Sequence, residues 1–218
     1  MLAKVLKRAL RFYFITDDNA PDLSPLDQVN ISINAGATII QYRNKAFALH
    51  SFEEVVAIRK LCKNSFIPFI VNDNILLAKA VMADGVHLGQ KDEDPAIARD
   101  ILGSEAIIGT SVHDPDELKR TDLSNCNYIG TGPVFPTATK ADAQKVRGLS
   151  NLEAVAKKSP LPVVAIGGIT STNAKSCFER GATGIAVISS VTRSKDPEKS
   201  AQELSASIRN YCDVFSQV

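Results

Sequence analysis

The chain has no tryptophan, only three histidines and only four cysteines among its 218 residues. The cysteines, Cys62, Cys126, Cys177 and Cys212, are widely spaced and form no CxxC pair. Structural zinc sites and dithiol redox motifs use closely spaced cysteines, so the sequence argues against both. We expect reduced, mostly buried thiols and a cytoplasmic protein.

An excess of one charge and long apolar runs are also missing. Lys and Arg number 25 against 24 Asp and Glu, a net charge of +1. This balance predicts neither a nucleic-acid partner nor a membrane-surface patch. No apolar run approaches the roughly 20 residues of a membrane span. The first residues, MLAKVLKRALRFYFITDD, have a short apolar part that ends in acids, so we do not expect a signal peptide.

Hydrophobic residues make up 44% of the chain and gather in short β-rich runs that alternate with helical stretches. The expected strands are 12–16, 37–43, 68–73, 85–89, 106–112, 127–134, 162–169 and 184–191. The expected helices are 25–35, 51–63, 75–83, 95–102, a short one from 114, 151–158, 172–180 and 197–211.

Eight strand–helix units in a row predict an α/β fold with a parallel sheet. Parallel strands need crossovers, and right-handed crossovers place the helices outside the sheet. Eight such units can close into a (β/α)8 TIM barrel, here a single domain over residues 1–218. An open, doubly wound sheet is the alternative. We favour closure because the strands are short, apolar and almost evenly spaced.

Four helix starts carry capping patterns. Ser51 and Ser150 each precede a Glu by three residues, as in a capping box. Asp114-Pro115 and Asp196-Pro197 place a side-chain acceptor before a proline in the first turn.

Polar residues follow the expected strands, where the functional face of a TIM barrel lies. In chain order they are Gln41, Arg43 and Lys45, then Asn72 and Asp73, Gln90 and Asp92, Ser111 and His113, the loop 130–140, Gly167 and Gly168, and Ser189 and Ser190. Taken singly, each has a simple structural explanation: solvated charges for Arg43 and Lys45, helix caps for Asp73 and Asp92. Within a strand, His87 is expected to be a satisfied core histidine.

Together, these residues suit phosphate chemistry. A diphosphate needs several cations and usually magnesium, which one or two carboxylates hold together with substrate phosphates and water. Asp73 and Asp92 come from adjacent strands and can converge on one ion. Arg43 offers a planar fork, and Lys45 and Lys140 offer point charges.

A second phosphate-binding site is expected at the same end of the barrel, across from the acids and cations. TIM barrels often bind phosphate on backbone N–H groups after strands seven and eight. Gly167-Gly168 and Ile188-Ser189 stand at those positions, where the backbone must approach the ligand closely.

At these residues the sequence resembles the thiamine-phosphate synthase family, also called thiamine-phosphate pyrophosphorylases. The motifs are QYRNK (41–45), ND (72–73), DGVHLGQKD (84–92), GTSVH (109–113), GTGPVFPTATK (130–140), IGGI (166–169) and ISSV (188–191). The resemblance covers nearly the whole chain, and PTATK is its most specific motif. It implies an enzyme that joins a hydroxymethylpyrimidine diphosphate to a hydroxyethylthiazole phosphate, with Mg²⁺ as cofactor and pyrophosphate as product.

The resemblance also implies roles for individual residues. The pyrimidine diphosphate ligands would be Gln41, Arg43, Lys45, Asn72, Ser111 and Lys140, and the magnesium ligands Asp73 and Asp92. The thiazole phosphate ligands would be Thr137, Ala138, Thr139, Gly168, Ile188 and Ser189. Arg43, Lys45 and Lys140 would stabilise the leaving pyrophosphate, so catalysis would rest on positioning and charge.

Other functions remain open at this point. A thiazole tautomerase-like barrel would need neither the Asp pair nor PTATK. A non-catalytic thiamine-phosphate-binding protein would retain the pocket without turnover. Another phosphate-binding isomerase or synthase barrel would explain the glycines and serines but not the two acids and three cations. The oligomeric state, including a homo-oligomer, is equally open.

Overall fold

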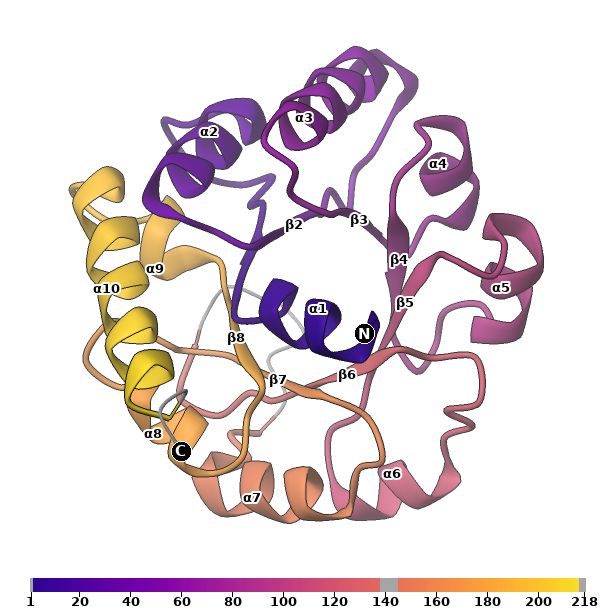
Figure 1. Ribbon diagram of the computed structural model, residues 1–218. Helices are drawn as coiled ribbons and strands as arrows, with labels where there is room; N and C mark the ends of the chain where they lie inside the picture. Colours follow the sequence, from indigo (N-terminus) through magenta and orange to yellow (C-terminus); the bar gives the residue numbers. More distant parts are fainter. Residues whose placement is uncertain (1, 138–144, 216–218) are drawn as a thin grey trace.

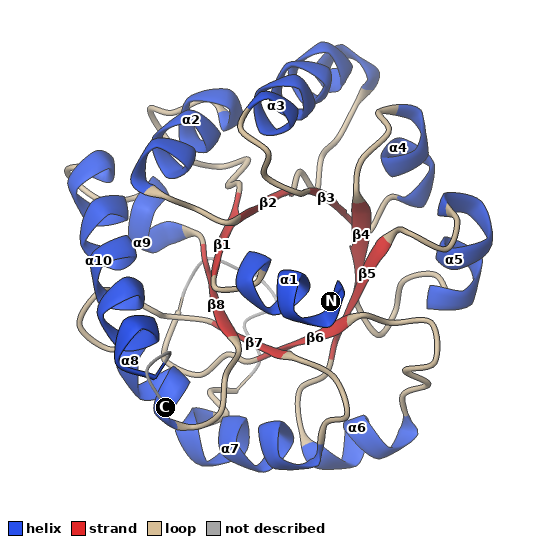
Figure 2. Ribbon diagram, in the orientation of Figure 1, coloured by secondary structure: helices blue, strands red, loops and turns tan. Residues whose placement is uncertain are grey.

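A computed structural model of the chain describes residues 2–137 and 145–215, with side chains for residues 4–137 and 145–211. Eight parallel strands pair in sequence order and close into a barrel, β1 against β8 (Figure 2). The strands are β1 Phe12–Ile15, β2 Ile39–Tyr42, β3 Phe69–Asn72, β4 Gly85–Leu88, β5 Ile107–Ser111, β6 Tyr128–Thr131, β7 Val163–Ile166 and β8 Gly184–Val187. The predicted (β/α)8 barrel is therefore confirmed, and the open sheet is excluded.

Helices surround the strand ring (Figure 1). They are α2 Pro25–Ala35, α3 Phe52–Asn64, α4 Ile75–Ala80, α5 Pro95–Leu102, α6 Pro115–Arg120, α7 Gly148–Lys158, α8 Ala174–Glu179, α9 Ser189–Thr192 and α10 Pro197–Phe215, with a short 3-10 turn, Leu49–Ser51, before α3. No helix in the described part of the chain is long and apolar enough to cross a membrane.

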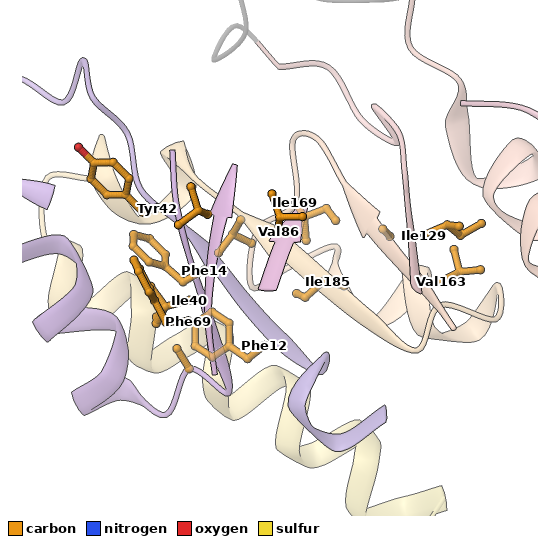
Figure 3. Close-up of a cluster of buried hydrophobic side chains, with 14 of the residues drawn as sticks. Phe12, Phe14, Ile40, Tyr42, Phe69, Val86, Ile129, Val163, Ile169 and Ile185 are labelled. Carbon is orange, nitrogen blue, oxygen red and sulfur yellow. The ribbon is translucent and has the colours of Figure 1, made fainter. Parts of the chain in front are cut away.

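Alternation along each strand divides the buried residues into two layers. Phe12, Phe14 and Ile40 point outward and pack beneath the helices, in the cluster shown in Figure 3. Tyr13 and Ile39 point into the barrel and join a smaller interior cluster. Residues i and i+2 of a strand share a face, so this division places every second strand residue next to the barrel axis.

An additional helix, α1 (Leu2–Ala9), lies over the end of the barrel where the strands begin (Figure 1). The sequence analysis assigned no element to this segment. Leu10 just after the helix is fully buried, and Leu6 packs with it against the interior cluster. The helix thus closes the end of the barrel opposite the predicted functional face.

Each of the eight strands is shorter than predicted, and the difference is largest for the last three, β6, β7 and β8. β6 ends at Thr131 because Pro133 has no N–H to continue a strand ladder. β8 ends at Val187, and Ser189–Thr192 forms the one-turn helix α9 where a strand to 191 was expected.

The capping predictions are half right. Asp114 accepts hydrogen bonds from two N–H groups of α6, and Asp196 accepts one from the N–H of Lys199. The two capping boxes are wrong. Ser51 is in helical conformation and makes no side-chain cap bond, while Ser150 lies inside α7, which begins at Gly148.

Candidate active site

A cavity of about 690 Å³ opens at the end of the barrel where the strands finish, and all eight strands contribute to its wall. The predicted site residues that line it are Gln41, Arg43, Lys45, Asn72, Asp73, Asp92, Ser111, Thr137, Gly168, Ile188 and Ser189. The other three, Ala138, Thr139 and Lys140, lie outside the described residues. One cavity therefore brings together every predicted site residue that the structure describes.

The two cations after β2 are held by an acid that the sequence analysis missed. Asp18, in the loop after β1, lies 3.6 Å from the Arg43 guanidinium and accepts a 2.9 Å hydrogen bond from the N–H of Lys45. Thr16 accepts a further 2.8 Å bond from the N–H of Arg43. Arg43 is only 8% exposed, so it is not a solvated surface charge. No motif pointed to Asp18, because its partners are close only in the folded barrel.

The predicted metal ligands meet beside these cations. Asp73 forms a 3.0 Å ion pair with Lys45, and its carboxyl group lies beside that of Asp92. Asp92 also accepts a 2.6 Å bond from the N–H of Gly89. Burial and the neighbouring Asp92 raise the pKa of Asp73 above its ordinary value, although Lys45 opposes this. Two carboxylates that lie side by side repel each other, and a bound cation relieves that repulsion, so the pair is suited to a cation.

Neither acid is a helix cap. The N-cap of α4 is Asn74, whose side chain accepts from the N–H of Leu77. The cap of α5 is Asp94. Asp73 instead has a positive φ of 62°, a conformation that is rare for a non-glycine residue and concentrates at functional sites. The simple structural explanation for Asp73 and Asp92 is thus excluded.

The side chains present here do not form a closed metal site. No group of three or more His, Cys, Asp or Glu among residues 2–137 and 145–215 is arranged to hold a metal ion. Two converging carboxylates are a donor set that magnesium accepts when substrate phosphates and water complete its shell. Asp73 and Asp92 fit that requirement.

Across the cavity, the wall consists of backbone. Gly167 and Gly168 have φ of 102° and 64°, in the region that favours glycine. A Cβ on Gly168 would lie 2.4 Å from the carbonyl oxygen of Pro136, in the loop after β6. The N–H of Phe135 also donates a 3.0 Å bond to the Gly167 carbonyl. The loops after β6 and β7 are therefore packed together, and Thr137 lies at their junction on the cavity.

The segment of helix α9 is fixed to the loop after the neighbouring strand β1. Arg193, just after it, forms a 2.8 Å ion pair with Asp17, which is 2% exposed. Burial opposes ionisation of Asp17, but the hydrogen bonds and charge of Arg193 hold its pKa below the ordinary value. This pair anchors the segment that brings Ile188 and Ser189 to the cavity.

A chain of hydrogen bonds runs through the floor of the cavity. The amide of Gln41 donates to Tyr13 (2.9 Å), and the hydroxyls of Tyr13 and Tyr128 lie 2.7 Å apart. His87 continues the chain, with Nδ1 3.1 Å from the Tyr128 hydroxyl and Nε2 3.0 Å from Ser111 Oγ. His87 is thus satisfied, as expected, but lines the cavity rather than the core. The tyrosines were missed because they lie within apolar runs. The signal that could have found Tyr13 is strand alternation, which places it with Ile15 on the inward face, opposite Phe12 and Phe14.

No cysteine lines the described part of the cavity wall. The described cysteines, Cys62, Cys126 and Cys177, are all buried free thiols. Burial raises the pKa of Cys62 and Cys177 to about 12 and that of Cys126 to about 11. Within the described residues, the arrangement offers charge, hydrogen bonds and bare backbone, which suits chemistry that proceeds by positioning and charge stabilisation.

Comparison with known proteins agrees with this geometry. A family model described as thiamine monophosphate synthase matches residues 12–191. A thiamine-phosphate synthase of Persephonella marina is 42% identical over 93% of this chain and 97% of its own, and one of Bacillus velezensis is 38% identical over 94% of each. The solved thiamine phosphate pyrophosphorylase of Pyrococcus furiosus superposes with a TM-score of 0.84 at 35% identity, covering 94% of this chain and 98% of that one. The chain therefore belongs to the thiamine monophosphate synthase family.

Proposed function

We propose that this barrel makes thiamine phosphate by a magnesium-assisted dissociative substitution, which joins 4-amino-5-hydroxymethyl-2-methylpyrimidine diphosphate to hydroxyethylthiazole phosphate and releases pyrophosphate. Synthesis of thiamine phosphate, a transferase reaction of thiamine biosynthesis, follows from the family. The observation that carries the proposed mechanism is the two-sided cavity. Paired carboxylates and cations form one side, and backbone held open by glycines forms the other.

The diphosphate belongs on the charged side in this proposal. Arg43 is buried and oriented by Asp18, so little side-chain freedom is lost when it binds an oxygen anion. Lys45 would exchange its contact with Asp73 for the phosphates. Gln41, Asn72 and Ser111, on the strand ends beside these cations, would hold the pyrimidine ring.

Asp73 and Asp92 would hold the magnesium ion. When bound, the ion would neutralise part of the negative charge on the leaving pyrophosphate. The raised pKa of Asp73, to which the neighbouring Asp92 contributes, supports this role, because it records a repulsion that a cation relieves.

The thiazole phosphate belongs on the glycine side. Gly168, Ile188 and Ser189 would bind its phosphate through backbone, and Thr137, Ala138 and Thr139 would contact it from the loop after β6. The close approach between Gly168 and Pro136 supports a shared site, since it fixes the end of that loop beside the backbone of β7.

The reaction needs no nucleophilic side chain. The bond between the pyrimidine methylene carbon and the diphosphate oxygen breaks, and pyrophosphate leaves with the electron pair. The amino group of the ring donates electrons to the resulting methylene cation, and the thiazole nitrogen then forms the new carbon–nitrogen bond with its lone pair. Arg43, Lys45 and Lys140 would stabilise the charge that grows on the leaving group.

The free buried thiols of Cys62, Cys126 and Cys177 support a cytoplasmic location, since reducing compartments keep thiols unpaired. We include that location in the proposal.

One assay tests the proposed function. Pyrophosphate release is measured with both substrates together, with each alone, and with or without magnesium. Release that requires both substrates and magnesium is expected. Reaction of the thiazole phosphate alone without magnesium would indicate a tautomerase, and tight binding of thiamine phosphate without turnover would indicate a binding protein.

A further inference from the structure

The hydrogen-bond chain in the cavity floor joins two of the three residues that the proposed function assigns to the pyrimidine ring. Gln41 and Ser111 come from β2 and β5, and Tyr13, Tyr128 and His87 connect them inside the barrel. Both tyrosines are at most 1% exposed, so their hydroxyls have no bulk water as an alternative partner. A buried chain of hydrogen bonds restricts the orientation of the groups in it.

Glycines make room for this chain. A Cβ on Gly109 would lie 2.2 Å from Cζ of Tyr128, so only glycine admits the ring at its observed position. A Cβ on Gly130 would lie 3.2 Å from Cε1 of His87, tighter than an ordinary contact. The rings of Tyr13 and Tyr128 are 5.9 Å apart at 52°, which holds the two hydroxyls against each other.

The chain has a direction. The amide nitrogen of Gln41 donates to the Tyr13 oxygen. Either tyrosine could donate in the contact between the two hydroxyls, but donation from Tyr13 to the Tyr128 oxygen is the direction that gives each hydroxyl proton an acceptor, because Tyr128 can then donate to His87. Tyr128 then donates to Nδ1 of His87, which leaves the histidine proton on Nε2 to be donated to Ser111 Oγ. Burial raises the pKa of both tyrosines, so each keeps the proton that this direction requires.

This direction decides what the two ends offer to a ligand. Gln41 uses its nitrogen inside the chain, so its carbonyl oxygen is the group left to accept a hydrogen bond. Ser111 accepts from His87, so its own proton is left to be donated. An aminopyrimidine carries an amino donor and acceptor nitrogens in its ring, which complement that pair.

We propose that Tyr13, Tyr128 and His87 are positioning residues, which set the hydrogen-bond direction of Gln41 and Ser111 and so select a ring that carries an amino group. The inference rests on the proposed function for the identity of the ligand. It adds a source of specificity that acts through Gln41 and Ser111 and resides in the barrel floor.

The test measures binding in the absence of the thiazole substrate. The probes are the aminopyrimidine diphosphate, its analogue with hydrogen in place of the amino group, and inorganic pyrophosphate, measured calorimetrically with magnesium. Wild-type protein should prefer the amino probe over the analogue. Tyr13→Phe and Tyr128→Phe should each lose roughly tenfold of that preference, the effect of one buried hydrogen bond, and keep their affinity for pyrophosphate.

Tyr42→Phe is the matched control. Tyr42 is as buried as Tyr13, but it points outward, and its hydroxyl lies 3.3 Å from Asn44 Nδ2, outside the chain. It should keep the wild-type preference. An unchanged preference in both test variants, or a parallel loss of pyrophosphate affinity, would overturn the positioning role. Failure of the wild-type protein to bind the amino probe would instead overturn the proposed function, and the inference with it.

Discussion

The ammonium group of Lys45 lies 3.0 Å from the carboxylate of Asp73, at the point where Asp73 also contacts Asp92. One ammonium group thus lies beside two carboxyl groups. A divalent ion and a diphosphate would together neutralise this excess of negative charge. The ion would bind the two carboxylates, and the phosphates would bind the ammonium group of the lysine. The first two predictions follow from this relationship.

Removing either acid should abolish magnesium-dependent turnover in a folded protein. We expect this for Asp73→Ala and Asp92→Ala, measured by pyrophosphate release and circular dichroism. The matched control is Asp94→Ala, two residues beyond Asp92. It removes the cap of α5 and should cost about 1 kcal/mol of stability without loss of the metal response. Near-full activity in Asp73→Ala or Asp92→Ala would show that the residue is not a metal ligand.

Magnesium should stabilise the protein more as pH rises. The pKa of Asp73 is raised in the folded state, so folding takes up protons there. The stability of the metal-free protein should therefore fall as pH rises from the unfolded pKa through the folded one. Magnesium binds the ionised acids, so its effect on Tm should be larger at about pH 7.5 than at about pH 5. The measurement is thermal unfolding with and without magnesium. An Asp73→Asn variant should lose most of the magnesium-dependent increase in Tm. An equal increase in Tm at both pH values would contradict the assignment of Asp73 as a metal ligand.

The thiazole side can be tested through its glycines. Gly168→Ala should raise the KM for thiazole phosphate at least several-fold and affect the pyrimidine diphosphate less, because the added Cβ would meet the Pro136 carbonyl. Gly103→Ala is the control. It has a positive φ of 90° but nothing within 4 Å of the added Cβ, so it carries only the backbone cost of about 1–2 kcal/mol.

Equal losses for both substrates in Gly168→Ala would count against a two-sided cavity. So would a similar change in KM for Gly103→Ala, since that position is remote from the site and shares only the backbone strain.

The barrel could be predicted from the sequence because its signals are local and repeated. A short apolar run followed by a helical stretch recurs eight times, and α2 and α5 begin at Pro25 and Pro95, as their predicted ranges did. The ends of the helices and strands were harder to predict. The one-turn helix from Ser189 has no pattern of its own, and α1 forms because Leu6 and Leu10 find the interior of the barrel, a contact absent from any local window.

The residues of the cavity also fall into two groups, those that could be predicted from the sequence and those that could not. Those that follow strands, such as Arg43 and Asp73, could be placed because a parallel barrel gathers strand ends at one face. Tyr128 could not, because a buried tyrosine in an apolar run resembles core until its hydroxyl meets that of Tyr13. Asp18 was missed for a related reason, since its contacts with the segment after β2 are between residues far apart in the chain.

The last prediction concerns Lys140, which lies outside the described residues, so its role rests on the sequence. It ends the PTATK motif, where the proposed function requires a cation beside the departing pyrophosphate. Charge grows on that group as the bond to carbon breaks, so the lysine should matter more in the transition state than in the ground state. Lys140→Ala should lower kcat by roughly a hundredfold and raise the KM for the pyrimidine diphosphate much less.

Two further variants separate a specific role for Lys140 from general loop charge. Lys140→Arg should restore the rate only in part, because a planar guanidinium does not replace a compact ammonium. Lys145→Ala removes an exposed lysine close by in the chain and should be nearly neutral. Steady-state kinetics on the three variants decide the matter: an unchanged kcat in Lys140→Ala would remove this lysine from the site and leave Arg43 and Lys45 as the proposed cations for the leaving group.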